Sequence, residues 1–147
     1  MGAEPYWYYV KYESDINNAL QKLKQQEFMA GRYNPVIDFL DFPIVANSPS
    51  PGAKHSSIQE AFNASEADGT RSILDIEKIA EKPDFCVATP LVDDIVEKIY
   101  GTKKPTREMI EKNMDFFEQV ERGHCIYLIL YKEGKPDEIL FAGYSFD

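Results

Sequence analysis

Histidine and cysteine are scarce in this sequence, which has two of each among its 147 residues. No C-x-x-C, H-x-x-x-H or H-E-x-x-H pattern occurs. A zinc or iron site needs three or four histidine, cysteine or carboxylate ligands at close spacing. We therefore expect no metal site and no cofactor. Cys86 and Cys125 lie far apart in the sequence, and we expect free thiols, as is usual in a cytosolic protein.

Long hydrophobic runs and net positive charge are also lacking. No run of 18 apolar residues occurs, so we expect no membrane-spanning segment. The opening MGAEPYWYY has neither the basic nor the apolar region of a secretory signal, which favours a cytoplasmic protein. The net charge of −9 repels nucleic-acid phosphates and anionic lipids. We expect neither nucleic acid nor membrane as a partner, whereas such an acidic surface is complementary to a basic protein.

The composition is that of an ordinary folded protein. Hydrophobic residues make up 44% of the chain and charged residues 28%, which are typical globular values. The length fits one domain, and no repeat or linker divides it, so we expect a single domain over residues 1–147.

The first half of the chain predicts a strand, a helix and a long irregular connection. Residues 6–12 are aromatic and β-branched, as strands are. A helix is expected from Ser14 to about Arg32, with Gly31 as its stop signal. Residues 33–55 contain four prolines, which exclude a long regular element. Long ordered connections of this kind are often functional.

The second half predicts several short helices and a C-terminal β-hairpin. A short helix begins at Ser56 or Ser57, and another begins at Thr106. Residues 71–80 fit either a helix or a buried strand, and the three-residue spacing of their isoleucines favours the helix. Residues 84–88 fit a short strand, followed by a helix with Thr89 as its N-cap and Pro90 in its first turn. Residues 125–131 and 138–146 predict the two strands of the hairpin.

These elements indicate an α+β fold. We expect a small, mostly antiparallel sheet, made of the N-terminal strand and the C-terminal hairpin and packed against four to five helices.

The segment PGAKHSS, residues 51–57, precedes a helix and partly resembles a phosphate-binding loop, but it lacks the first glycine, the Lys-Ser junction and the upstream strand. A weaker anion site at this helix start stays open, and capping by exposed polar residues is its alternative. The candidate ligand-binding residues are Arg32, Tyr33, His55, Ser56 and Arg71. Both arginines could instead tie the loop down through carboxylates, which is the role we favour. No motif assigns a catalytic residue.

Aromatic residues offer a second kind of candidate surface. Side chains alternate along a strand, so residues 6–9 place aromatic rings on both faces of it. Trp7 and Tyr9 are the candidate partner-binding residues, because tryptophan and tyrosine are favoured interface anchors. Packing of these rings in the core is the alternative.

Three segments, YWYYV, GTRSILDIE and DEILFAGYSFD, resemble a group of short uncharacterised bacterial proteins. The resemblance implies a bacterial cytoplasmic protein and carries no function. Two functional hypotheses follow from the sequence as a whole. The first is a non-catalytic, acidic, intracellular protein-interaction module. The alternative is a small anionic-ligand-binding protein or enzyme, with a pocket at the loop of residues 34–55.

Overall fold

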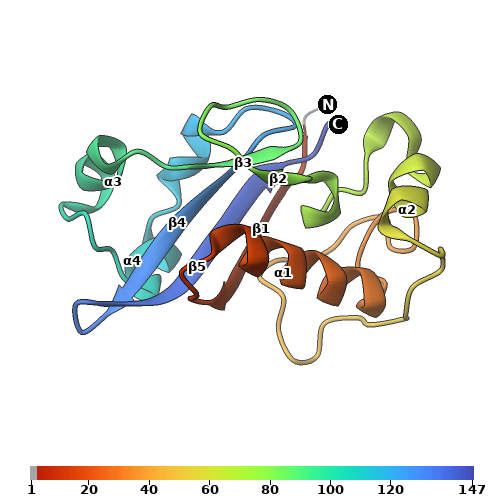
Figure 1. The fold of residues 1–147 in the computed structure, drawn as a ribbon, viewed down its shortest axis with the longest axis horizontal. Helices are drawn as coiled ribbons and strands as arrows, with labels where there is room; N and C mark the ends of the chain where they lie inside the picture. The colour runs from red at the N-terminus through yellow and green to blue at the C-terminus, as the bar shows by residue number, and fades with distance from the viewer. Residues whose placement is uncertain (1–2) are drawn as a thin grey trace.

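The computed structural model describes residues 3–147, which form a five-stranded mixed sheet with helices on both faces (Figure 1). The strand order is β1-β5-β4-β3-β2. The strands are β1 (Pro5–Lys11), β2 (Lys78–Ile79), β3 (Val87–Pro90), β4 (Cys125–Lys132) and β5 (Lys135–Tyr144). β5 is antiparallel to both β1 and β4, whereas β2, β3 and β4 run parallel.

The predicted N-terminal strand and C-terminal hairpin are both present and pair with each other. The hairpin turn is tighter than expected, because Glu133 and Gly134 alone connect the strands, with φ values of 53° and 78°. Two positive φ values match the twist of a two-residue hairpin turn. The prediction of a mostly antiparallel sheet holds for β1, β5 and β4. The sheet is larger than expected, since β3 and β2 extend it in parallel.

The described residues contain four α-helices: α1 (Ile16–Ala30), α2 (Ile58–Ala64), α3 (Asp93–Tyr100) and α4 (Arg107–Lys112). The side chain of Asp15 caps α1 by accepting a hydrogen bond from the Asn18 amide, one residue later than we expected. Gly31 ends α1 in the left-handed conformation, as predicted. Ser57 and Thr106 cap α2 and α4 through their side chains.

Two expectations for the middle of the chain were wrong. Thr89 and Pro90 do not open a helix, because both pair with β4 as part of β3, and α3 begins only at Asp93. Residues 71–80 form no α-helix. They contain a 3-10 turn, η2 (Ile73–Asp75), and then the short strand β2. The isoleucine spacing therefore reflects burial against the sheet and not helical periodicity.

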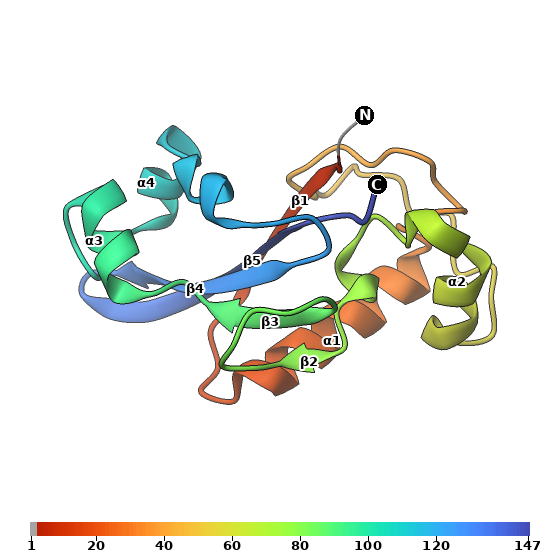
Figure 2. The ribbon, with the colours of Figure 1, turned by 90° about the horizontal axis from the view of Figure 1, so that it is seen from above.

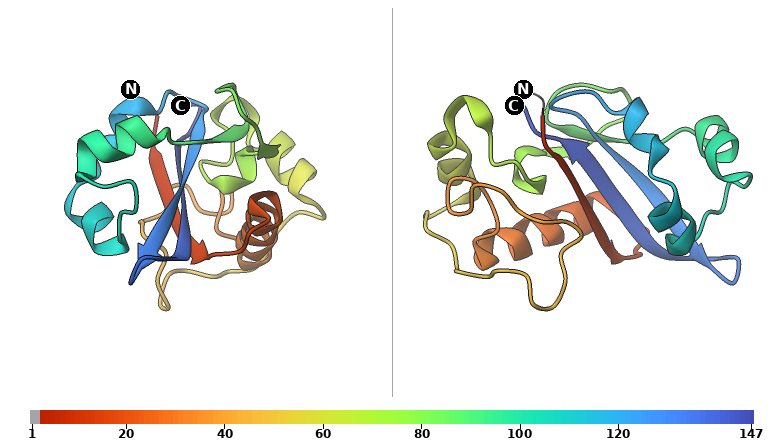
Figure 3. Two further views of the ribbon diagram at one scale, coloured as in Figure 1. Left: turned by 60° about the vertical axis from the view of Figure 1, so that its left-hand side comes forward. Right: turned by 180° about the vertical axis from the view of Figure 1, so that it is seen from behind.

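Two apolar cores lie on opposite faces of the sheet, as Figures 2 and 3 show by the helices on either side. Along β1, Tyr6 and Tyr8 join the core beneath α1, while Trp7 and Tyr9 pack against the core beneath α3 and α4. This alternation follows the two-residue period of a strand. Burial of both faces also explains the nearly continuous apolar sequence of β4.

The long connection between α1 and α2 is tied to the end of α1. The Gly52 amide donates to the carbonyl of Ala30 at 2.9 Å. A Cβ atom on Gly31 would lie only 2.2 Å from the carbonyl oxygen of Gly52, so the two backbones meet directly at this point. No helix within residues 3–147 is both long and apolar enough to cross a bilayer.

Candidate functional site

A cavity of about 270 Å³ lies where α1, α2 and the segment around η2 meet the start of β3. Its lining joins an apolar wall to several ionisable side chains. The lining residues are Lys24, Ile58, Gln59, Phe62, Leu74, Asp75, Glu77 and Cys86. A small concave site with an apolar wall and a few convergent polar groups is typical of ligand-binding pockets.

Lys24 enters this cavity from the buried face of α1. Leu20 and Phe28, one turn to either side, are buried on the same face. Lys24 itself is only 7% exposed, and none of the ion pairs or side-chain hydrogen bonds among residues 3–147 includes it. Burial lowers the pKa of its ammonium, against the opposing effect of the carboxylates of Glu77 and Asp75. The side chain of Lys24 is therefore mostly buried, and its ammonium has no direct partner among the described residues.

Asp75 ends η2 and is 4% exposed. Its Oδ1 accepts hydrogen bonds from both the amide and the hydroxyl of Thr70 at 2.7 Å. Its Oδ2 is buried and has no partner among the described residues. Burial raises the pKa of this carboxyl to about 6, although the hydrogen bonds from Thr70 oppose the rise. A Cβ at Gly69 would lie 2.8 Å from Oδ2, so the glycine leaves room for the carboxylate.

A second buried carboxylate, that of Glu27, has hydrogen-bond partners for both of its oxygens. Glu27, one turn after Lys24 on α1, is 1% exposed and accepts hydrogen bonds from both Nε and Nη2 of Arg32 at 2.7 Å. This bidentate pair uses both oxygens of the carboxylate. Lys24 has no such partner, and Oδ2 of Asp75 is one of four buried polar side-chain atoms without a partner among the described residues, with the hydroxyls of Tyr6 and Tyr9 and Nε of Arg71.

Cys86 lies at the edge of the cavity with a strained backbone. Its φ of 65° is unusual for a residue other than glycine. Backbone hydrogen bonds fix it, since its carbonyl accepts from Glu77 at 2.7 Å and its amide donates to Gly123 at 3.1 Å. Burial first, and then the charge of Asp75, raise the pKa of the thiol. The thiolate form needed for nucleophilic attack is therefore disfavoured.

A second cavity, of about 390 Å³, lies between the end of β1 and α1. Two of its three charged lining residues are paired, because Glu13 accepts from Lys22 at 3.1 Å, and Glu13 also accepts from the Asn18 side chain at 2.6 Å; the third, Lys11, is exposed to solvent. Both partners in the ion pair are also solvent-accessible. The cavity is larger, but it holds no buried group that lacks a partner.

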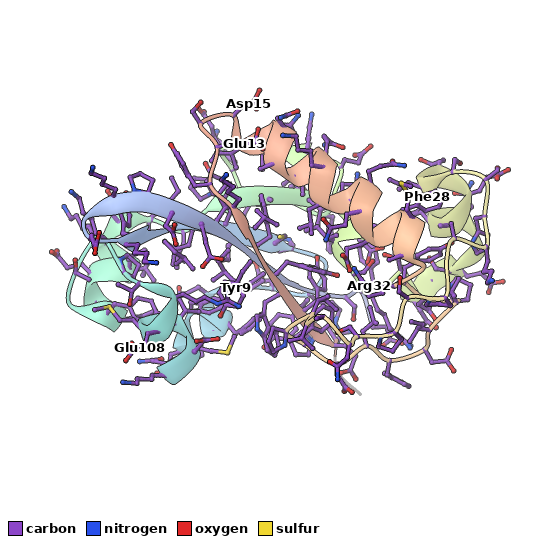
Figure 4. All side chains as sticks on the ribbon, turned by 90° about the horizontal axis from the view of Figure 1, so that it is seen from below. Tyr9, Glu13, Asp15, Phe28, Arg32 and Glu108 are labelled. Carbon is purple, nitrogen blue, oxygen red and sulfur yellow. The ribbon has the colours of Figure 1, made fainter. Side chains whose placement is uncertain are left out.

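The sequence-predicted ligand residues make their contacts outside the Lys24–Asp75 cavity. Arg32 binds Glu27 at the end of α1, beside the long connection (Figure 4). The Tyr33 hydroxyl lies 2.8 Å from Nδ1 of His55, and Tyr33 is fully buried. Ser56 hydrogen-bonds the carboxylate of Glu60.

Arg71 is held by three contacts near the long connection. It donates to the carbonyl of Asp38 at 3.1 Å, pairs with Asp68 at 3.5 Å and stacks over the ring of Phe39. The structure therefore brings Tyr33 and His55 together, whereas Arg32 and Arg71 each contact other groups.

The two candidate partner-binding residues are half-buried. Trp7 packs edge-on against Phe117 and lies 5.7 Å from Phe42, measured between ring centroids. Tyr9 faces α4, where the guanidinium of Arg107 lies 4.0 Å from its ring centroid (Figure 4). Both rings contribute to the second core, and both remain partly accessible.

The candidate residues predicted from the sequence include neither Lys24 nor Asp75. One signal was available. The apolar stripe of the first helix includes Leu20 and Leu23, and a lysine at position 24 falls on the same face. The residues around η2 that line the same cavity could not be found from the sequence, because their position depends on how this segment packs against α1.

Within residues 3–147, no group of three or more His, Cys, Asp or Glu side chains is arranged to hold a metal ion. No family model, curated protein or solved structure matches this chain, so the chemistry of the site is what supports a functional assignment.

Proposed function

We propose that this protein binds a small polar molecule in the cavity lined by Lys24 and Asp75. One observation carries the proposal: Lys24 and Asp75 are both more than nine-tenths buried and line the same cavity, and the Lys24 ammonium has no hydrogen-bond or ion-pair partner among the described residues. A buried polar group without a partner costs about 1–3 kcal/mol, and more if it is charged. A ligand whose acceptor group pairs with the Lys24 ammonium recovers this cost, which favours the bound state.

Binding is a better supported role than covalent catalysis. Burial together with nearby carboxylates raises the pKa of the Cys86 thiol, which lines the cavity, so the thiol is poorly suited to nucleophilic attack. The rigid backbone around Cys86, held by strands and turns, instead suits a preformed binding site.

An NMR titration tests the proposal. Isotope-labelled protein is titrated with a library of small polar fragments, and amide shifts are followed. We expect at least one fragment to shift the amides around residues 24, 58–62 and 74–86. Lys24→Met weakens this binding, while Lys22→Met, on the exposed face of the same helix, leaves it unchanged. Shifts that cluster at the Glu13–Lys22 cavity, or no shifts at all, contradict the proposal.

A protein-interaction role is a second proposal, supported by a different feature. Phe39 and Val45, in the long connection, are 66% and 54% exposed. Exposed apolar side chains on a strongly acidic protein favour a partner with a basic surface. The free thiols of Cys86 and Cys125 fit the proposed cytoplasmic location, where disulfides are rare.

The test of this second proposal is a pull-down from bacterial lysate at low and high salt. A basic protein captured at low salt, released at high salt and lost with Phe39→Ser supports it. Met109→Ser, which alters an exposed methionine on α4, is the matched control. Equal capture by both variants contradicts a role for the connection.

A further inference from the structure

Lys24 combines a buried stem with an amine that stays open to the cavity. The residue lies on the buried face of α1 and is 7% exposed. Its Nζ has no hydrogen-bond or ion-pair partner among residues 3–147, yet it is not one of the fully buried polar atoms that lack a partner, so it keeps some accessible surface. The ionisable groups close enough to influence its charge are Glu77, Asp75 and Cys86. All three line the same cavity, which places the amine there.

A lysine in these surroundings is more reactive than an exposed one. Burial lowers the pKa of the Lys24 ammonium, and the carboxylates of Glu77 and Asp75 only partly oppose this effect. A larger fraction of Lys24 is therefore the neutral amine at neutral pH, and the neutral amine is the nucleophilic form. Lysines activated by desolvation in an apolar pocket are those that form imines with carbonyl compounds.

The rest of the cavity fits a neutral ligand with an apolar group. A ligand that carries a carboxylate would meet the negative charges of Glu77 and Asp75 beside the amine, and like charges repel in a site of reduced dielectric. A carbonyl group has no net charge, and its oxygen accepts a hydrogen bond from the Lys24 ammonium on arrival. Three side chains supply the apolar wall: Ile58, Phe62 and Leu74. The cavity volume of about 270 Å³ lies just below the usual range for ligand pockets, which favours a small ligand.

We propose that Lys24 captures a small aldehyde with an apolar chain as a reversible imine. This inference rests on the proposed binding function and names the class of ligand. The ammonium first loses a proton to solvent, and the neutral amine attacks the carbonyl carbon while one amine proton passes to the carbonyl oxygen. The second amine proton then leaves with the hydroxyl group as water, and the C=N bond forms. Water reverses the reaction, so Lys24 holds the ligand without turning it over.

The test uses 3-methylbutanal as the probe and sodium cyanoborohydride to reduce any imine to a stable secondary amine. Wild-type protein is labelled at neutral pH over a range of aldehyde concentrations, and peptide mass spectrometry measures the labelling rates of Lys24 and Lys22 in the same sample. We expect the rate at Lys24 to saturate and to exceed that at Lys22 by about tenfold or more, because a bound aldehyde is held beside the amine. Equal rates at both lysines, or a rate at Lys24 that rises without saturation, overturn the inference.

A competitor and two variants separate the imine from reactions elsewhere on the protein. 3-Methylbutanol has the same chain and no carbonyl, so we expect it to occupy the cavity and to slow the labelling of Lys24 but not of Lys22. Lys24→Arg keeps the positive charge and cannot form the imine, so we expect the saturable labelling to vanish. Lys22→Met should leave the rate at Lys24 unchanged. Saturable labelling that persists in Lys24→Arg shows that another lysine is the reactive one, which overturns the assignment.

The results also separate this inference from the proposed function. If polar fragments shift the amides around the cavity and Lys24 is not labelled preferentially, the imine is wrong and the binding function stands. If no fragment binds and Lys24 is not labelled preferentially, both are wrong.

Discussion

The buried carboxyl of Asp75 makes the stability of the unliganded protein depend on pH in a predictable direction. Its pKa is raised from the ordinary value of 3.8 to about 6 in the folded state. A group whose pKa is higher when folded favours folding while it is protonated. That contribution is complete below about pH 3.8 and is lost as the pH rises through 6.

The magnitude follows from the size of the pKa change. A rise from 3.8 to about 6 corresponds to about 3 kcal/mol, at about 1.36 kcal/mol per pH unit. Asp75→Asn removes the titration and keeps an oxygen that can accept the two Thr70 hydrogen bonds. Part of this contribution is already lost at pH 4, so the wild-type free energy of unfolding, measured relative to the variant, should fall by about 2.4 kcal/mol between pH 4 and pH 7.

The assay is urea unfolding followed by circular dichroism at half-unit steps from pH 4 to pH 7.5. The difference between wild type and variant cancels the contributions of all groups that titrate equally in both proteins. Both proteins retain the neighbouring Lys24, Glu77 and Cys86. Asp41→Asn, at an exposed position, is the control and should follow the wild-type curve. Parallel curves for wild type and Asp75→Asn would refute the reasoning, because they would show that this carboxyl is not desolvated in the folded state.

Three further predictions concern groups that hold the first helix and its connection in place. Glu27→Gln leaves the guanidinium of Arg32, whose side chain is 11% exposed, without its charged partner, and we expect a loss of about 3 kcal/mol in urea unfolding; a loss below 1 kcal/mol would contradict a largely desolvated pair. Tyr33→Phe removes a hydroxyl that makes two hydrogen bonds, and we expect a loss of about 1–3 kcal/mol by the same assay. Gly31→Ala forces a Cβ into the adjoining backbone and should lower the melting temperature far more than Gly134→Ala, whose added Cβ meets no atom within 4 Å; equal effects would refute the close approach.

The sequence predicted the elements whose signals are local. The hairpin is encoded by two apolar segments around Gly134, and the first helix by its apolar stripe and Gly31. Capping by Thr106 was also predicted correctly, because a threonine side chain satisfies helix amides directly. Each of these features depends on residues close together in the chain.

The elements that the sequence did not predict depend on distant contacts. Pro90 resembled a first-turn helix proline, but the pairing of Thr89 with β4 places it in a strand. β2 has only two residues and exists because it pairs with β3. The parallel half of the sheet therefore had no local signature that could be recognised.

The candidate site was missed for the same reason. Lys24 and Asp75 are about fifty residues apart, and the packing of η2 against α1 is what places them at one cavity. A lysine on an apolar helix face was visible as an irregularity in the sequence. Its meaning depended on which side chains the fold places around the same cavity.

A crystal structure of the protein soaked with polar fragments tests the central claim most directly. The account predicts a bound molecule in the cavity with an acceptor atom within hydrogen-bond distance of Nζ of Lys24. Ordered water alone in this cavity, with fragments bound only elsewhere on the protein, would contradict it.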